Sequence, residues 1–180
     1  MTAAGDDSEY ELERVRDLVR SVPDYPEPGV LFRDLTPVLA DAEAFATLTT
    51  ELAAWAGAAD LVAGVEARGF LIGAAVALVA GTGVVPIRKA GKLPSVAGTR
   101  TYDLEYGTAT LELPAGVVEP GTTVFVVDDV LATGGTAAAA CGLLTDAGAE
   151  VTGFATVIEL AALRGRDKLP GVEVHSLLSY

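Results

Sequence analysis

The chain has 180 residues, of which 51% are hydrophobic and 21% are charged, so we expect one globular domain over residues 1–180 with a sizeable core. Its 12 basic and 25 acidic residues leave a net charge of −13, which argues against a general nucleic-acid binder. A single cysteine, Cys141, and a single histidine, His175, exclude an internal disulfide, a cysteine-based zinc site and a histidine-cluster metal site, and they suit a reducing cytoplasm.

The N-terminal part of the chain is predicted to contain two helices separated by a loop. An apolar stripe predicts an amphipathic helix over residues 8–22. An ordered loop follows from Pro23 to Gly29, because its prolines fix the backbone and resist helix formation. Residues 41–57 are predicted to form the second helix, with Asp41 as its cap.

The next segment is apolar and imitates a membrane span. Residues 69–87, GFLIGAAVALVAGTGVVPI, carry no charge and have the length of a spanning helix. Gly81-Thr82-Gly83 interrupts this run, so we predict a buried helix from Arg68, a turn, and a buried strand over 84–89. The short apolar run LVAGVE, residues 61–66, is predicted to be the strand before that helix.

The C-terminal half alternates between strands and helices. Residues 90–107 are polar and long for a connection, which is typical of a functional lid. The sequence TATLEL alternates in polarity and indicates an antiparallel or edge strand. Alternation of strands with helices indicates an α/β fold with a mainly parallel sheet flanked by helices. The predicted elements are strands over 108–113, 124–127, 151–159 and 172–178, and a helix over 136–147.

The stretch VFVVDDVLATGGTAAAA, residues 124–140, combines two features that favour a phosphorylated sugar. The loop from Ala132 to Thr136 opens a helix, whose free N–H groups attract an anion, and its glycines let a phosphate approach closely. Asp128 and Asp129 would repel that phosphate, but ionised carboxylates accept hydrogen bonds from a vicinal diol. A sugar 5-phosphate would suit both the loop and the two aspartates. The alternative is that this stretch is only a capped helix after a buried strand.

A cluster of basic residues indicates a second anion-binding group. Two of the chain's three lysines, Lys89 and Lys92, lie in IRKAGK beside Arg88. Arg68 follows another predicted strand and is a further candidate contact. For each residue alone the alternative is a solvated charge, but together they outline a site for two separate phosphate groups.

At this point the sequence resembles a known family. VFVVDDVLATGGT is similar to the phosphoribosyl-pyrophosphate motif of type I phosphoribosyltransferases. Further stretches resemble the members of that family that act on adenine: EPGVLFRDLTPVL, GVEARGF, IRKAGKLP, YDLEYG and ELAALRGRDKL. The resemblance runs from about Pro23 to the C-terminus. It implies a five-stranded parallel core, a small hood contributed mainly by residues 23–40, and a mobile lid over residues 90–107.

The resemblance also implies an activity. It implies a purine salvage enzyme of the cytoplasm that converts adenine and 5-phosphoribosyl 1-pyrophosphate to AMP and pyrophosphate. Mg²⁺ would arrive bound to phosphoribosyl pyrophosphate rather than in a cage of side chains, and the protein would be a homodimer without a nucleic-acid or membrane partner. Two alternatives stay open: a guanine or hypoxanthine phosphoribosyltransferase, and a non-catalytic regulator that senses phosphoribosyl pyrophosphate and binds DNA.

Matching positions to the family implies a role for each candidate residue. Asp128 and Asp129 would hold the ribose hydroxyls, and the loop would hold the 5-phosphate through Ala132, Thr133, Gly134, Gly135 and Thr136. The pyrophosphate side would comprise Arg68, Lys89 and Lys92. Adenine would stack on Phe32, with the backbone near Leu31 and Arg33 reading its edge. Glu105 would be the acid/base residue, with Tyr106 beside it.

Overall fold

The computed structural model describes residues 12–103 and 107–180. The chain divides into two compact units, one up to Glu51 and one over Leu52–Tyr180. Helix α3 (Ala42–Ala56) crosses this division. The single domain that we predicted over residues 1–180 stays a prediction, and each unit is described by itself.

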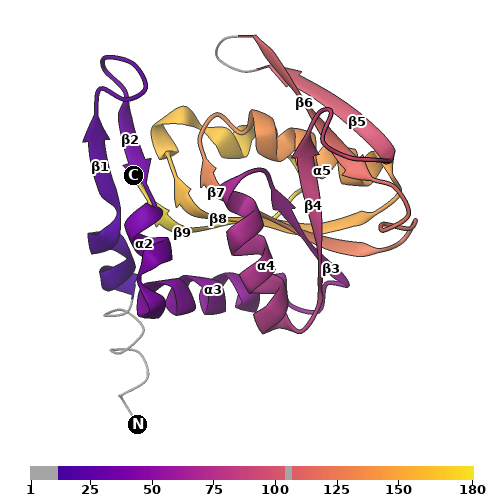
Figure 1. The fold of residues 1–180 in the computed structure, drawn as a ribbon, viewed down its shortest axis with the longest axis horizontal. Coiled ribbons are helices and arrows are strands. Elements are labelled where there is room, and N and C mark those ends of the chain that lie inside the picture. Colours follow the sequence, from indigo (N-terminus) through magenta and orange to yellow (C-terminus); the bar gives the residue numbers. More distant parts are fainter. Residues whose placement is uncertain (1–11, 104–106) are drawn as a thin grey trace. The chain divides into compact units, whose positions relative to one another are not determined.

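The first unit contains a helix, a hairpin and a short second helix. Residues 12–18 are helical. Strand β1 (Arg20–Pro23) then pairs antiparallel with β2 (Leu31–Asp34), as Figure 1 shows, and α2 (Thr36–Ala40) follows. The predicted helix over 8–22 is therefore wrong in its last turn, because pairing with β2 overrides the local apolar stripe.

The second unit is built on a seven-stranded sheet with the order β5-β6-β4-β3-β7-β8-β9 (Figure 1). Five neighbouring strands, in the order β4-β3-β7-β8-β9, run parallel to one another. The hairpin of β5 and β6 adds two antiparallel strands beside β4. This confirms the predicted α/β fold with its parallel five-stranded core. The strands are β3 (Leu61–Val65), β4 (Gly83–Lys89), β5 (Val96–Asp103), β6 (Thr108–Pro114), β7 (Thr123–Leu131), β8 (Glu150–Glu159) and β9 (Val174–Ser179).

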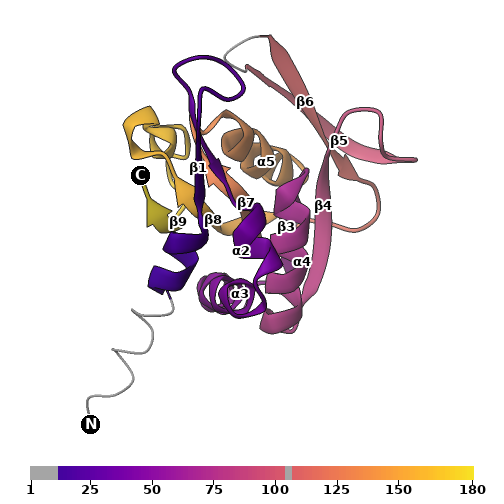
Figure 2. The same cartoon turned by 60° about the vertical axis from the view of Figure 1, so that its left-hand side comes forward.

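Two helices cover opposite faces of this sheet (Figures 1 and 2). Helix α4 (Arg68–Ala80) connects β3 to β4, and α5 (Gly135–Asp146) connects β7 to β8. The two crossovers run in opposite directions along the sheet, and right-handed crossovers then place their helices on opposite faces. Glycines bring α4 close to β3, since a Cβ on Gly73 would lie 3.0 Å from the Gly64 Cα. The short 3₁₀ helices η1 (Ala161–Leu163) and η2 (Gly165–Lys168) follow β8.

The structure corrects two sequence predictions in this unit. The polar connection over 90–107 is not irregular throughout, because Val96–Asp103 forms β5 and pairs with β6 along its length (Figure 2). Strand β6 is antiparallel, as one of the two alternatives had it, but it lies between β5 and β4, so β5 is the edge strand. Strand β7 continues to Leu131, so the two aspartates belong to the strand.

The apolar segment over 69–87 forms α4, a turn and β4, as predicted. Within the described part of the chain, no helix combines the length and the apolar character that a membrane span requires.

Candidate active site

The candidate site lies where the crossover connections of two adjacent strands run in opposite directions. The crossovers from β3 and from β7 leave these adjacent strands toward opposite edges, and such a switch point opens a crevice at the carboxyl ends of the strands. Arg68 opens the helix after β3, while Asp128 and Asp129 lie near the end of β7. The fold thus brings together two motifs about sixty residues apart in the sequence.

Arg68 and Asp129 form an ion pair at this switch point. The Arg68 Nε lies 2.7 Å from Asp129 Oδ2, and the carboxylate is nearly buried. Asp129 Oδ2 is buried and accepts no well-aligned hydrogen bond from the described residues, so its contact with the guanidinium is chiefly Coulombic. We predicted Arg68 on the pyrophosphate side, and the structure pairs it with Asp129, for which we predicted a role in holding the ribose hydroxyls.

Asp128 is buried next to Asp129, near the end of β7. Burial raises the pKa of Asp128 well above its ordinary value, and the neighbouring Asp129 charge raises it further. Its Oδ1 accepts a hydrogen bond from the Asp129 backbone N–H at 2.9 Å. The first turn of α4 encloses it, because a Cβ on Gly69 would lie 2.9 Å from Asp128 Oδ1.

The predicted phosphate loop forms a small cradle at the start of α5. Residues 130–137 and Asp128 line a hollow of about 80 Å³, larger than the roughly 30 Å³ that one water occupies in the liquid. Gly134 has φ +78°, a conformation that favours glycine, and α5 begins at the next residue. The first N–H groups of a helix have no partner within the helix and favour an anion, so the 5-phosphate site that we predicted at this loop stays a prediction that this geometry allows.

The end of β5 lies against this loop. The Thr136 hydroxyl donates a hydrogen bond to the Tyr102 hydroxyl at 3.2 Å. A Cβ on Gly135 would lie 3.2 Å from the Asp103 carbonyl oxygen. The side chain of Thr136 therefore has a protein partner in Tyr102.

The basic cluster has an acidic partner that sequence reasoning missed. Glu66, directly after β3, pairs with Lys92 Nζ and accepts a hydrogen bond from the Lys89 backbone N–H at 2.9 Å. Its Oε2 also lies 3.4 Å from Arg88 Nε. Burial raises the pKa of Glu66, but the hydrogen bonds from Lys92 and Lys89 outweigh burial and leave the pKa below its ordinary value.

A second buried carboxylate holds the same segment. Glu112 of β6 accepts a hydrogen bond from the Gly91 backbone N–H at 3.0 Å, while its other oxygen is buried and accepts none from the described residues. The basic cluster and its segment therefore have carboxylate partners within the chain, in addition to any external anion. The GVEARGF stretch contained Glu66, but only the parallel pairing of β3 with β4 brings that carboxylate to Lys92.

The residues predicted to bind adenine lie together on β2 in the first unit. The Phe32 ring packs edge-on against Tyr25, with ring centroids 5.2 Å apart, and Leu31 is about half exposed. The Arg33 guanidinium donates a hydrogen bond to the Ser21 hydroxyl at 2.5 Å. Glu105 and Tyr106, the predicted acid/base residue and its neighbour, lie outside the described residues.

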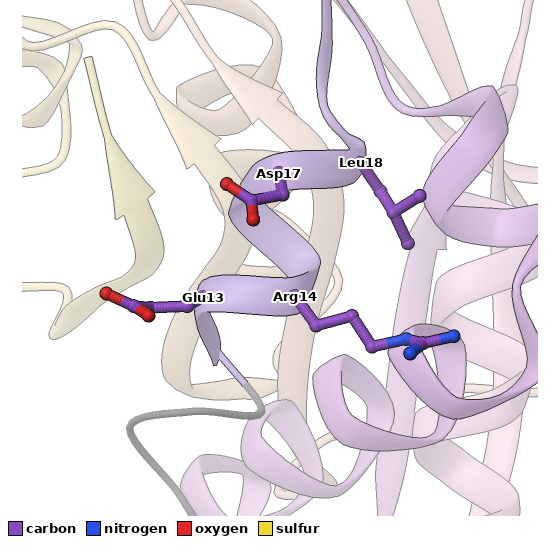
Figure 3. Close-up of a pocket in the computed structure, with 4 residues that line it drawn as sticks. All are labelled: Glu13, Arg14, Asp17 and Leu18. Carbon is purple, nitrogen blue, oxygen red and sulfur yellow. The ribbon is translucent and has the colours of Figure 1, made fainter.

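The first unit contains a larger hollow, and none of the predicted site residues that the structure describes lines it. About 360 Å³ in volume, it is lined by Glu13, Arg14, Asp17 and Leu18. Figure 3 shows the two carboxylates on one side of the helix, with Arg14 and Leu18 extending from the other. Arg14 pairs with Asp41 at 2.7 Å, so this hollow offers an anion little. Among the described residues, no group of three or more His, Cys, Asp or Glu side chains is arranged to hold a metal ion.

Comparison with known proteins agrees with this geometry. The family described as "Phosphoribosyl transferase domain" matches residues 38–177, which include both motifs at the switch point. An adenine phosphoribosyltransferase of Saccharopolyspora erythraea is 58% identical over 174 residues, covering 97% of this chain and 95% of that protein.

Solved structures give the same result. The crystal structure of adenine phosphoribosyltransferase from Rhodothermus marinus has a TM-score of 0.89 and 43% identity, covering 96% of this chain and 99% of that one. The enzyme from Saccharomyces cerevisiae, complexed with an imino-altritol bisphosphate and adenine, has a TM-score of 0.88 and 36% identity, covering 94% and 99% of the two chains. The chain belongs to the phosphoribosyltransferase family, and within it to the adenine phosphoribosyltransferases.

Proposed function

We propose that the protein transfers the 5-phosphoribosyl group of phosphoribosyl pyrophosphate to adenine, giving AMP and pyrophosphate in purine salvage. The observation that carries this proposal is the switch point, where a phosphate cradle, an acidic pair and Arg68 share one edge of the sheet. The names of the relatives support adenine as the base, and one relative was crystallised with adenine and a sugar-like bisphosphate.

The 5-phosphate is proposed to bind the loop from Ala132 to Thr136. The backbone N–H groups at the start of α5 and the helix dipole favour an anion there. The hydroxyls of Thr133 and Thr136 add donors, and Gly134 and Gly135 allow close approach.

The acidic pair is proposed to hold the ribose hydroxyls and to favour the reacting state. Positive charge develops on the ribose ring as the bond to pyrophosphate breaks, and Asp128 and Asp129 provide negative charge beside it. The Arg68–Asp129 ion pair holds one carboxylate in place before the substrate arrives.

The leaving pyrophosphate is proposed to bind Arg68, Lys89 and Lys92. Lys92 pairs with Glu66, so a pyrophosphate has to compete with that carboxylate. Mg²⁺ is proposed to enter with phosphoribosyl pyrophosphate, because it keeps several waters and takes oxygen ligands from the substrate. The carboxylates of the site suit this arrangement, since Asp129 and Glu66 are already engaged with cations of the chain.

Adenine is proposed to stack on Phe32, while the backbone near Leu31 and Arg33 selects the base. An aromatic face is tolerant of which base it meets, so selection comes from hydrogen bonds at the edge. A backbone carbonyl accepts from the adenine amino group and repels the carbonyl of guanine or hypoxanthine.

Glu105 is proposed as the acid/base residue that accepts the proton adenine loses, with Tyr106 beside it. Such a group typically contributes about 10²–10⁴-fold in rate. Replacing Glu105 with Gln should lower the single-turnover rate at least tenfold and leave binding of phosphoribosyl pyrophosphate nearly unchanged. A surviving single-turnover rate would refute the assignment.

We also propose a cytoplasmic homodimer. The outward face of α4 supports a protein interface, because Leu71, Leu78 and Val79 are each more than half exposed and the helix carries no charge after Arg68. The proposed compartment rests on the family resemblance. The proposed homodimer rests on the resemblance and on this apolar surface.

The activity is tested by supplying phosphoribosyl pyrophosphate and Mg²⁺ with one purine at a time. AMP should form with adenine, and guanine and hypoxanthine should give little nucleotide. Efficient turnover of guanine would overturn the specificity proposal, and no nucleotide with any purine would overturn the enzyme itself.

A further inference from the structure

A short segment after β8 supports the phosphate loop from behind through backbone contact. A Cβ on Gly134 would overlap the Gly165 carbonyl oxygen, so the two backbones touch at this point. A Cβ on Gly165 would in turn lie 3.1 Å from the Gly134 nitrogen and would overlap the Ala132 carbonyl oxygen. Gly165 therefore contacts the phosphate loop directly, and no larger residue fits at either glycine without moving the loop.

A buried carboxylate and an arginine fix that segment in place. Arg166, next to Gly165, donates from Nε and Nη2 to the two carboxylate oxygens of Glu159 at 2.7 and 2.6 Å. Its Nη1 donates to the Val174 carbonyl at 2.5 Å, and the Ser176 hydroxyl donates to Glu159 at 2.7 Å. A guanidinium that meets a carboxylate with two parallel hydrogen bonds is held in one orientation.

Glu159 also connects this network to the strand that carries the phosphate loop. It is the last residue of β8 and pairs in register with Leu131, the residue before the loop. The next residue, Leu160, donates its backbone N–H to the Leu131 carbonyl at 2.9 Å. The segment is thus anchored at Glu159 and Leu160, passes through η1, and returns at Gly165 against the loop.

We propose that Glu159 and Arg166 are positioning residues for the 5-phosphate. The inference rests on the proposed function of the same loop. Their ion pair presses the Gly165 backbone against Ala132 and Gly134, which keeps the N–H groups of the loop aimed at one point. Because a phosphate gains most from donors that are already oriented, loosening the segment weakens binding of the 5-phosphate and leaves the pyrophosphate side unchanged.

The test compares two ligands on each variant by calorimetry. AMP reports on the 5-phosphate loop, and inorganic pyrophosphate with Mg²⁺ reports on the basic side. We expect Arg166→Met to raise the Kd for AMP at least tenfold and to leave the Kd for pyrophosphate within twofold. Arg166→Lys keeps the charge but not the two parallel hydrogen bonds, so it should recover only part of the AMP affinity.

Two further variants keep the inference falsifiable. Gly165→Ala leaves the ion pair intact and should weaken AMP binding in the same selective way, which covers the case that Arg166→Met does not fold. Arg164→Asn is the matched control, because it removes an exposed ion pair with Asp167, tolerates the left-handed backbone of Arg164, and should not change either Kd. A thermal melt of each variant shows that the protein tested is folded.

The outcomes separate this inference from the proposed function. Unchanged AMP affinity in folded Arg166→Met or Gly165→Ala protein would overturn the positioning role. An equal loss of AMP and pyrophosphate affinity would also overturn it, since that pattern indicates general destabilisation. Absence of AMP formation by the unmodified protein would instead contradict the proposed function.

Discussion

The basic side chains of this site have acidic partners within the chain. Arg68 contacts Asp129, Lys92 contacts Glu66, and both carboxylates are nearly buried. Buried charges are costly unless they are paired, so each of these ion pairs offsets part of the cost of burying its carboxylate. At the scale of single residues, the proposed binding of pyrophosphate to Arg68 and Lys92 would compete with these carboxylates.

This competition predicts the effect of replacing Glu66 with Gln. The variant keeps a hydrogen-bond acceptor for the Lys89 backbone N–H and removes the negative charge that faces Lys92. Pyrophosphate should then bind several-fold more tightly, which titration calorimetry with Mg²⁺ present would measure. Weaker binding by a folded variant would mean that Glu66 positions Lys92 for the ligand instead of competing with it. Glu112→Gln is a suitable comparison, because Glu112 holds the same segment without contacting Lys92.

Asp128 carries a cost in stability that depends on pH. Its pKa is raised well above the ordinary value of 3.8, so the folded state binds this proton more tightly than the unfolded chain does. Stability from this group is therefore lost as pH rises from about 3.8 through the raised pKa, and the full cost remains above it.

Replacing Asp128 with Asn should remove that cost and lower activity. We expect the variant to melt at a higher temperature than the unmodified protein at pH 8, and the difference should shrink toward pH 5, because the stability cost of Asp128 decreases as pH falls. Turnover should fall, because the developing ring charge loses an anionic neighbour. Thermal melts at the two pH values check the sign, and a difference that grows toward pH 5 would contradict it.

At the scale of elements, the contact of α4 with β7 decides where Arg68 lies. Gly69 is the second residue of α4, and its missing side chain lets the helix start within reach of the Val127 carbonyl and Asp128. This close approach is what allows a residue after β3 to pair with a residue of β7. The same glycine therefore serves both packing and the site.

Replacing Gly69 with Ala tests this contact. The added methyl group would lie 3.0 Å from the Val127 carbonyl oxygen, so the helix has to shift. Overpacking of this kind typically costs about 1–3 kcal/mol, and the free energy of unfolding should fall by that order in urea titration. The kcat should fall as well, since Arg68 moves from Asp129. An unchanged kcat would show that the ion pair does not depend on this contact.

At the scale of the whole molecule, the net charge of −13 and the apolar face of α4 act in opposite directions. Like charges keep copies of the chain apart, whereas an exposed apolar helix face favours burial against a partner. A homodimer forms through this face only if the burial of its apolar side chains outweighs the repulsion between like charges.

The assembly is testable at Leu78, whose side chain is 82% exposed. Leu78→Glu should give a monomer in sedimentation velocity at concentrations where the unmodified protein is a dimer, while the monomer keeps its circular dichroism spectrum. Val117→Glu is a control, because Val117 is also exposed and lies in the turn after β6. A dimer that survives Leu78→Glu would exclude this face as the interface.

Much of the site could be predicted because its residues are close in sequence. Asp128, Asp129 and the loop from Ala132 to Thr136 form one uninterrupted motif, and their chemistry follows from their order. Glu66 could not be identified in this way, because its partner Lys92 lies in the connection after β4, and the pairing depends on the register of β3 with β4. The β5 strand was missed for the same reason, since its polar sequence becomes a strand only by pairing with β6.

The sequence by itself determined the α/β alternation, the parallel core and the cradle at the start of α5, because each depends on the period of apolar residues or on neighbours along the chain. Only the tertiary structure decided which charges meet. It pairs Arg68 with Asp129 and Lys92 with Glu66, and it brings Gly165 behind the phosphate loop. Contacts between residues far apart in sequence depend on strand order and crossover direction, and a local pattern carries no record of either.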